Sequence, residues 1–527
     1  MLELLARLRP HAGAIAAVLL LLLGAGAGAA ATLNLWENRL ALHPAWAATK
    51  PTLERGVMGA LAFVAGPQGV ARNRLRLDAW FGFQEVLHRD ALDPTRLALR
   101  FRVAPGGYLH VLYDHRPDGF AGVRFGSHPD FPSVHYRAAP DGEFTAREPL
   151  AAGLVRPDVW HRAELRFAGA EVELRLDGAS AGRFARRPGP QRVGFRGGLR
   201  GAEVDDVVLE TSAGVLEEGF ANGRGFGARF AAAFAALAAA AAAAAAALRR
   251  SGVPARQIGP AVAVAAAVAG AGVAGAYGVV YWRGREYRVS RSDAEREQAY
   301  WVEASRAAVV GAIRARYAPQ VAPGTFRLLV LGTSQTWGAG ARAEEETFVR
   351  RLEPLLAARL GRPVECVNAA VSALRTRHVL GLLRRELAGL NASAALVNLA
   401  NNDVDVERFR RDLDALAGEL ARRGIPAVFA LEPNSVERVP GDTPHGDLAA
   451  KHEVVRAVAA RHGRPVVDLH GWLAERRDAG FLWWDFVHLT SFGHRLVAGF
   501  LADALPPLLG DAAATGPGAG APRAPAR

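Results

Sequence analysis

The stretch LVLGTSQTWGAG, residues 329–340, decides the fold of the carboxy-terminal half of this 527-residue chain. It starts as an apolar run, stops at Gly332, Thr333 and Ser334, and reopens with two further glycines. Such a turn from strand to helix is either an ordinary tight connection or a device that holds up a nucleophile. The rest of the chain distinguishes these interpretations, because a nucleophilic serine needs a base and donors for an oxyanion.

Outward from this stretch, strand patterns and helix patterns alternate. The strand candidates are FRLLVLG (326–332), VECVNAA (364–370), AALVNLA (394–400), IPAVFALE (425–432) and RPVVDLH (464–470). Amphipathic segments such as residues 406–424 separate them. Nearly continuous apolar strands indicate burial on both faces, so the alternation predicts a doubly wound, flavodoxin-like parallel α/β sheet over residues 318–510. Active sites in such sheets lie at the carboxyl ends of the strands, which is where Ser334 stands.

A candidate base lies near the other end of this region, in WWDFVHLTSFGH, residues 483–494. Asp485 and His488 are three positions apart, so on one helical turn or compact loop the carboxylate can hold the imidazole Nδ1–H. Nε2 is then left to take the proton of Ser334. An isolated histidine would more often be structural, but the accompanying aspartate favours the catalytic interpretation.

Two further segments can supply oxyanion donors. NLANNDVD, residues 398–405, places Asn402 at the carboxyl end of a buried strand, where its side-chain amide can donate. VNAAVSALRT, residues 367–376, ends another strand and can supply a backbone N–H.

These residues, taken together, resemble the SGNH hydrolases, the family of GDSL-type esterases and lipases. Ser334, Ala373, Asn402 and the pair Asp485 and His488 match the four blocks of that family in order. The resemblance implies that Ser334 is the nucleophile, His488 the general base and acid, and Asp485 the residue that orients the imidazole. It further implies that the oxyanion donors are the N–H groups of Ser334 and Ala373 and the amide of Asn402. No metal or cofactor is implied.

Three positions depart from the family pattern. Thr333 stands where the family usually has aspartate, and Ala373 and Ala400 stand where it has glycine. A backbone N–H survives the change from glycine to alanine, but the added methyl group can crowd the pocket or require a different φ. These departures bear on rate and substrate size more than on the chemistry.

Residues 75–212 show a different pattern, with short runs that alternate apolar and polar positions. Examples are residues 96–103, 108–115, 161–168 and 171–178. Period-two runs separated by turn dipeptides predict an antiparallel β-sandwich. VWHRAELRFAGAEVELRLDGASAGRF and VGFRGGLRGAEVDDVVLE resemble the later strands of laminin-G or concanavalin-like jelly rolls.

Several residues of this region could bind a ligand. Trp80, Tyr108, Tyr113 and Trp160 could stack on sugars, but aromatic residues at alternating positions are more often core residues, and we favour the core. The adjacent carboxylates at 205 and 206 could bind calcium, although ending an edge strand is the more ordinary role.

Three apolar segments suggest a membrane. Residues 13–35 follow Arg7 and Arg9 without a charge, which predicts an anchor or a cleavable signal segment over residues 1–35. Residues 230–248 and 258–282, joined by a basic turn, predict a transmembrane hairpin over 228–282. An alanine-rich hairpin outside the membrane remains the alternative. The membrane interpretation places both large regions on the extracytoplasmic side of a cell membrane, periplasmic or extracellular.

The composition excludes several other classes of protein and site. The formal net charge is +12, but the arginines are scattered among alanine, glycine and proline, so no nucleic-acid partner is expected. The single Cys366 excludes an internal disulfide framework and a cysteine-rich metal site. Residues 291–317 are expected to form a helical connector, and residues 511–527 a disordered tail.

The sequence therefore predicts a membrane-anchored, extracytoplasmic serine ester hydrolase that removes O-acyl groups from a glycan through an acyl-enzyme. One alternative is an O-acyltransferase of polysaccharide modification, which would require a multi-span membrane protein as partner. Another is a tethered glycan-binding protein without catalytic activity.

Overall fold

The computed structural model describes residues 18–19, 21–26, 45–48, 74–77, 85–198, 201–220, 226–260, 262–264, 266–267, 306–372, 374–435, 447–484 and 487–510. The chain divides into two compact units. The first unit comprises Met1–Arg102, Val159–Pro190 and Ala202–Ser290, and the second comprises Val103–Asp158, Gln191–Gly201 and Arg291–Arg527. Strands of the region predicted as a β-sandwich therefore occur in both units.

The first unit contains an antiparallel sheet with the strand order β11-β10-β9-β4-β13-β14. Its strands are β4 (Pro94–Val103), β9 (His161–Ala168), β10 (Glu171–Leu176), β11 (Ala179–Ala185), β13 (Ala202–Thr211) and β14 (Gly214–Glu218). The short β2 (Leu75–Leu77) pairs with β13, and β1 (Trp46–Ala48) pairs with β3 (Glu85–His88). Along β9, buried residues alternate with more exposed ones, as the period-two sequence predicts.

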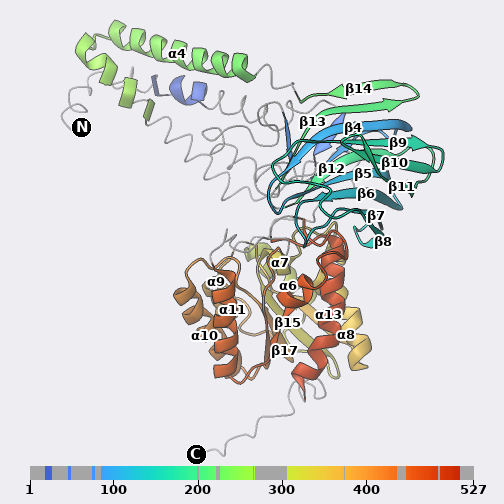
Figure 1. The fold of residues 1–527 in the computed structure, drawn as a ribbon. Coiled ribbons are helices and arrows are strands. Elements are labelled where there is room, and N and C mark those ends of the chain that lie inside the picture. Colours follow the sequence, from blue (N-terminus) through green and yellow to red (C-terminus); the bar gives the residue numbers. More distant parts are fainter. Residues whose placement is uncertain are drawn as a thin grey trace, which may run out of the picture. The chain divides into compact units, whose positions relative to one another are not determined.

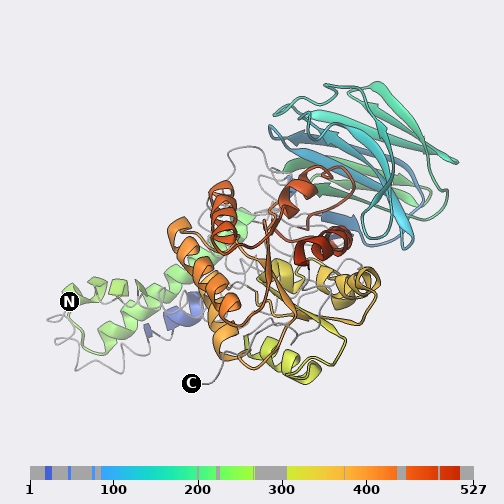
Figure 2. The ribbon, with the colours of Figure 1, turned by 90° about the horizontal axis from the view of Figure 1, so that it is seen from below.

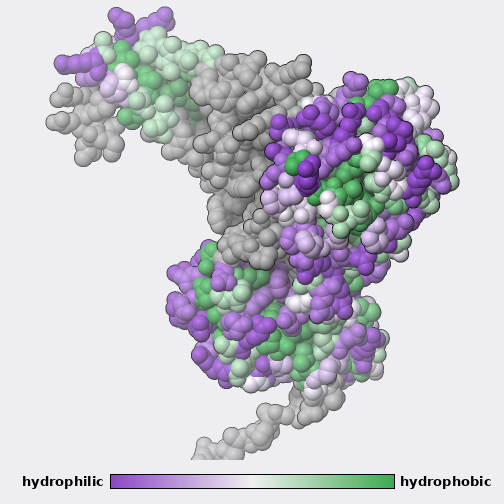
Figure 3. Space-filling model, viewed as in Figure 1, coloured by the Kyte–Doolittle hydropathy of each residue, from purple (hydrophilic) through white to green (hydrophobic). Residues whose placement is uncertain are grey.

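The helical part of the first unit is built around α4 (Phe226–Arg250). Near its end, Ala244 and Leu248 form a small buried cluster with Val18, Leu22 and Val253. The described parts of the three apolar segments thus contact one another. Much of this region is pale green in Figure 3, the colour of weakly hydrophobic residues.

For the described part of the chain, the prediction of membrane helices at 13–35, 230–248 and 258–282 is wrong; residues 13–17, 27–35 and 268–282 of these segments lie outside the described residues. Among the described residues, no helix combines the length and the apolar character that a membrane span requires. The reason lies in the alanine content of α4: alanine has the highest helix propensity, so an alanine run favours a helix whether or not a membrane surrounds it. Its single methyl group adds little apolar surface, so an uncharged run of this kind does not predict a membrane span.

The second unit contains five antiparallel strands in the order β12-β5-β6-β7-β8. They are β5 (Tyr108–Arg116), β6 (Gly119–Gly126), β7 (Val134–Ala138), β8 (Phe144–Pro149) and β12 (Arg192–Gly197). Tyr108 and Tyr113 are buried, which confirms the core role favoured for them. Trp160, in the first unit, is half-buried beneath the guanidinium groups of three arginines, and Trp80 lies outside the described residues.

The second unit also contains a parallel sheet in the order β16-β15-β17-β18-β19. The strands are β15 (Phe326–Gly332), β16 (Val364–Asn368), β17 (Ala394–Asn398), β18 (Ala427–Ala430) and β19 (Val466–Val467). Numbered along the chain this order is 2-1-3-4-5, that of a flavodoxin-like sheet. A strand therefore lies within each of the five predicted ranges, but the last range, 464–470, holds only Val466–Val467 as strand and its residues 469 and 470 begin α12. The chain reverses its direction of winding at β15.

Helices cover both faces of the parallel sheet (Figures 1 and 2). The helices are α6 (Arg306–Arg316), α7 (Ser334–Trp337), α8 (Phe348–Leu360), α9 (Thr376–Arg385), α10 (Val406–Arg422), α11 (Leu448–Arg461), α12 (Leu469–Ala474) and α13 (Ser491–Leu509). Leu329 and Leu331 of β15 join a core with residues of α6 and α9–α11, whereas Leu328 and Val330 join a second core with α8 and α13. This division explains why every residue of β15 is buried. The antiparallel β-sandwich region and the doubly wound domain agree with the predicted fold classes.

Candidate active site

The turn after β15 is so tight that several of its positions have room only for glycine. A Cβ on Gly332 would collide with the side chain of Thr336, one turn into α7. Gly338 ends α7 with a φ of 113°, and Gly340 has a φ of 95° with the carbonyl of Leu489 where a Cβ would lie. These are conformations and contacts that only glycine tolerates well. The glycines therefore fix Ser334 at the carboxyl end of β15.

His488 lies beside this serine. Its Nε2 is 2.8 Å from the Oγ of Ser334, although the two residues are 154 positions apart in the sequence. Both residues are 8% exposed. A serine hydroxyl donates a hydrogen bond to Nε2 when the neutral imidazole carries its proton on Nδ1, which is the arrangement that a general base needs.

His488 belongs to a segment that we call the histidine loop, of which residues 481–484 and 487–490 are described. Trp483 and Leu489 form an antiparallel bridge at its neck. The Trp484 N–H donates to the carbonyl of His488 (2.8 Å), and the Thr490 N–H donates to the carbonyl of Leu482 (2.9 Å). These backbone bonds tie both ends of the loop together and so restrict where His488 can lie.

Two sequence-predicted site residues, Asp485 and Ala373, lie outside the described residues. The contact of Asp485 with His488, and the N–H donor at position 373, therefore stay predictions.

Asn402 lies beyond the end of β17, the strand next to β15. Its side-chain amide donates to the carbonyl of Leu374 (2.9 Å), beside position 373. This bond joins two of the predicted donor segments and uses one of the two amide N–H groups. Across the part of the chain that is described, the Ser334 N–H has no acceptor, as expected for the first residue of a helix.

Sequence reasoning missed Gln335, which connects the nucleophile turn to the histidine loop. Its side-chain Nε2 donates to the carbonyls of Val487 (2.7 Å) and Pro433 (3.0 Å). Its Oε1 accepts from the amide of Asn398 (3.2 Å). The side chain next to the serine therefore holds the residue next to the histidine. The one available signal was an amide placed directly after the serine.

Glu432 is a second missed residue, fully buried two positions after β18. It accepts a bond from the Asn401 N–H (2.6 Å) and lies 3.5 Å from the hydroxyl of Thr333. Burial raises the pKa of this carboxyl to about 7, although the Asn401 N–H and the charge of Lys451 partly counteract the effect. Glu432 thus bridges the turn that holds Ser334 and the segment that holds Asn402. A glutamate ending an apolar strand was its signal in the sequence.

His494 of the WWDFVHLTSFGH stretch has a structural position. It is completely buried, its Nδ1 accepts from the Phe348 N–H (3.3 Å), and its Nε2 faces the carbonyl of Ala339 (3.4 Å). Burial lowers its pKa to about 3, so the imidazole is neutral at physiological pH. A neutral ring with Nε2–H satisfies both partners and joins the nucleophile turn to α8.

Residues 330–496 match the model of the GDSL-like lipase/acylhydrolase family. Solved structures with a similar chain include a lipase/acylhydrolase from Enterococcus faecalis, with 21% identity and a TM-score of 0.30, covering 34% of this chain and 95% of its own. An acetylxylan esterase from Geobacillus stearothermophilus has 20% identity and a TM-score of 0.31, covering 35% of this chain and 94% of its own. No curated protein matches the chain.

The family match spans Ser334, Asn402 and His488, the predicted residues whose geometry is described above. The carboxy-terminal region is a GDSL/SGNH acylhydrolase domain, and the chain is a serine esterase, as predicted from its sequence. The jelly-roll resemblance of residues 75–212 is supported in part, by the antiparallel sheets.

Proposed function

We propose that this esterase hydrolyses O-acyl groups on a glycan through a covalent acyl-enzyme, with Ser334 as nucleophile and His488 as general base. Oγ of Ser334 attacks the acyl carbon while its proton passes to Nε2 of His488. The tetrahedral intermediate collapses as its C–O bond to the sugar breaks, and the departing sugar oxygen takes that proton from His488 and leaves as a hydroxyl. Water, deprotonated by the same imidazole, then attacks the acyl-serine and releases a carboxylic acid and the free serine.

The observation that carries the proposal is the 2.8 Å separation between Nε2 of His488 and Oγ of Ser334. Serine is a weak nucleophile unless a base lies within hydrogen-bond reach, and this distance meets that requirement. In the proposal Asp485 orients the imidazole. The oxyanion would be bound by the N–H groups of Ser334 and Ala373 and by the second amide N–H of Asn402, which has no acceptor in the described structure.

The glycan substrate rests on a different observation, the antiparallel sheets that accompany the hydrolase domain and their resemblance to laminin-G and concanavalin-like folds. An extracytoplasmic location also belongs to the proposal and rests on the other interpretation of residues 1–35, a cleavable signal segment with a basic start and an apolar stretch. It is tested by fusing a reporter enzyme that is active on one side of the membrane alone to the carboxyl end of the chain.

The test uses the full chain, a fluorophosphonate probe and three esters: an aryl acetate, an O-acetylated polysaccharide and a long-chain lipid ester. Ser334→Ala and His488→Ala should each lower turnover by at least about 10³-fold and abolish labelling. Ser393→Ala is the matched control, since Ser393 is equally buried in the same domain but bonds the Arg327 N–H. It should react like the wild type.

Three results would change the proposal. A folded wild-type chain that neither labels nor turns over any ester would refute it. Preference for the lipid ester would refute the glycan part alone. Acyl transfer to a second sugar in place of water would favour an acyltransferase.

A further inference from the structure

The histidine loop is anchored on the antiparallel sheet of its own compact unit, not within the hydrolase domain alone. Residues 478–483, which end with the first residues of the loop, contact strands β5 to β8 and β12 at several points. These strands and the loop are more than 280 positions apart in the sequence, and both belong to the second unit.

Phe481 is the centre of this contact. Its ring is 7% exposed and lies among four aromatic rings of the antiparallel sheet. Centroid distances are 4.8 Å to His110, 5.5 Å to Phe120, 5.4 Å to Phe144 and 5.9 Å to Tyr136. The ring of Phe120 stacks on it with an interplanar angle of 17°. The sheet surface thus encloses one side chain of the hydrolase domain, as an anchor in a pocket does.

Backbone bonds fix the same segment. The Phe481 N–H donates to the carbonyl of Gly142 (2.8 Å), and the Phe144 N–H donates to the carbonyl of Ala479 (2.8 Å). Between them, Glu143 and Gly480 form an antiparallel bridge. Backbone bonds of this kind set the register of residues 479–481 against the turn at 140–143, and not merely their proximity.

Arg196 of β12 contacts the histidine loop directly. Its guanidinium Nη2 donates to the carbonyl of Trp483 (2.7 Å), and its Cζ lies 4.2 Å from the centroid of the Phe481 ring. The side chain is buried, so this cation–π contact and the hydrogen bond are both largely shielded from water. Arg196 therefore links the anchor ring to the neck of the histidine loop.

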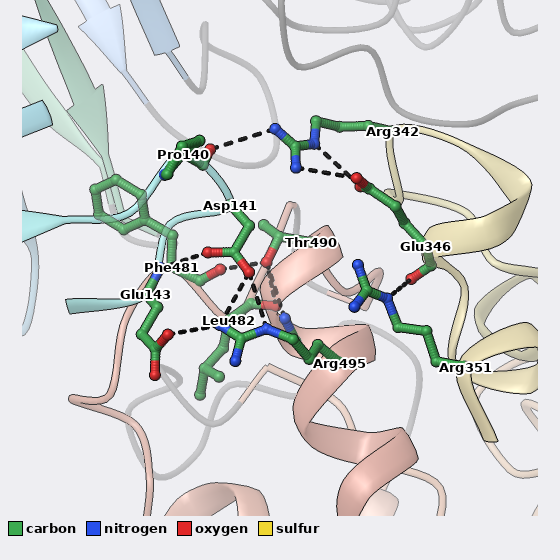
Figure 4. Close-up of polar contacts among 11 residues, drawn as sticks. Pro140, Asp141, Glu143, Arg342, Glu346, Arg351, Phe481, Leu482, Thr490 and Arg495 are labelled. Carbon is green, nitrogen blue, oxygen red and sulfur yellow. Dashed lines mark hydrogen bonds and ion pairs between the residues drawn. The ribbon is translucent and has the colours of Figure 1, made fainter. Parts of the chain in front are cut away.

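Ion pairs surround the contact. Arg495 of α13 bonds Asp141 (2.9 Å) and Glu143 (2.7 Å), while Arg342 reaches the carbonyl of Pro140 (3.4 Å), as Figure 4 shows. On the other side, buried Arg124 of β6 pairs with Asp478 (2.8 Å).

A short path leads from this anchor to the catalytic atoms. The hydroxyl of Thr490 donates to the carbonyl of Phe481, and the Thr490 N–H donates to that of Leu482, so the two ends of the loop are fixed to the anchor (Figure 4). His488 lies two positions before Thr490, and Trp484 bonds its carbonyl. We therefore expect a displacement of Phe481 to change the position of Nε2 relative to Ser334.

We infer that Phe481 and Arg196, together with the sheet residues that hold them, are positioning residues for the hydrolase reaction. The antiparallel sheet is then part of the catalytic apparatus, because it holds the base in place. This inference rests on the proposed function of Ser334 and His488. A misplacement of about 1 Å in such a pair lowers the rate about 10²-fold, so a partial loss of support should show in kcat.

The test changes the sheet and leaves the hydrolase domain untouched. Phe120→Ala in the full chain removes the ring stacked on Phe481. It should lower kcat and the fluorophosphonate labelling rate about tenfold or more, leave KM for a small ester unchanged, and shift the pH midpoint of kcat. Phe120→Leu, which keeps most of the bulk, should recover most of the rate.

Phe184→Ala is the matched control. Phe184 is 7% exposed on β11 in the other unit, so its loss should lower the thermal midpoint without changing kcat. Should Phe120→Ala fail to fold, the double variant Asp141→Asn/Glu143→Gln removes the partly exposed partners of Arg495 and should lower kcat about threefold.

The experiment distinguishes failure of this inference from failure of the proposed function. A folded Phe120→Ala variant, or the double variant, with kcat within twofold of wild type and an unchanged pH profile would overturn the inference. A wild-type chain without any turnover would instead refute the proposed function.

Discussion

The two halves of the candidate site are held in different ways. The nucleophile turn is fixed by its own neighbours: Gly332 leaves room for Thr336 four positions on, and Gly338 ends the same short helix. The histidine loop is fixed by residues such as Phe120 and Arg196, which belong to another sheet and lie more than 280 positions away.

This contrast indicates which half of a catalytic pair can be altered by substitutions at distant residues. A turn whose geometry is local should tolerate changes elsewhere and fail when one of its own atoms is crowded. A loop held by distant partners should respond to changes that contact no catalytic atom. The predictions below test this contrast, starting with the largest expected effect.

Gly332→Ala should disrupt the nucleophile turn, the half of the site that is fixed by its own neighbours. The new methyl group would overlap Thr336 Cβ, which cannot swing away, so we expect a loss of about 3 kcal/mol in unfolding free energy. Displacement of Ser334 should also lower fluorophosphonate labelling about 100-fold. Urea denaturation and labelling rates measure the two effects. Gly389→Ala is the control, because a Cβ there meets open space, and equal behaviour of the two variants would contradict the prediction.

Glu432→Gln should show how the buried carboxyl behind the nucleophile turn makes the unfolding free energy depend on pH. The pKa of Glu432 is about 7 in the folded chain against an ordinary 4.5, so the unfolded chain releases this proton first as pH rises. Wild-type stability should therefore fall between about pH 4.5 and 7, by up to about 3 kcal/mol. The glutamine variant has no such carboxyl, so its unfolding free energy should rise relative to that of the wild type as pH increases. Urea denaturation at pH 5 and 8 checks it, and parallel pH curves would contradict it.

Gly142→Ala should affect the histidine loop, the half of the site that is held by distant residues. Gly142 has a φ of 98°, and an added Cβ would lie 3.1 Å from Cβ of Phe481. We expect a loss of about 1–2 kcal/mol from backbone strain and a drop in kcat of about tenfold from the displaced anchor. Gly153→Ala, with a φ of 69° and open space around it, carries the strain without the contact. If both variants keep full kcat, the contrast between the halves fails.

Thr490→Val should have the smallest effect. Its hydroxyl caps α13 by accepting from the Gly493 N–H (3.2 Å) and also bonds the carbonyl of Phe481. Loss of the cap should lower the unfolding free energy by about 1 kcal/mol, with a modest fall in kcat. Thr490→Ser keeps the hydroxyl and should restore both values. Thermal denaturation and ester turnover measure them, and a serine variant as poor as valine would assign the effect to packing.

The sequence allowed prediction of whatever depends on local pattern. The parallel strands, and Ser334 at the end of the first of them, follow from apolar runs and glycines close together in the chain. The pairing of Ser334 with His488, 154 positions away, could be predicted only through the resemblance to the SGNH hydrolases. Alanine misled the same reasoning, because a helix former without much apolar surface gives an uncharged run with no membrane span.

Residues whose role depends on distant partners escaped prediction. Gln335 bonds the carbonyls of Pro433 and Val487, and Glu432 bonds the Asn401 N–H. Phe481 reads in the sequence as one more apolar residue before WWDFVH. Its aromatic partners come from strands whose own pattern carries no sign of an outside partner, so tertiary contacts alone identify it.

The anchoring of Phe481 also has a consequence for the order in which the protein is made. A ribosome completes residue 144 long before residue 481; the interval of 337 residues (481 − 144) takes roughly 15–70 s at about 5–20 residues per second. Throughout that time the rings of Phe120, Tyr136 and Phe144 lack the side chain that covers them. The aromatic surface formed by these rings therefore stays unfilled until residue 481 has been translated, and the base reaches its place only after residue 488 has followed.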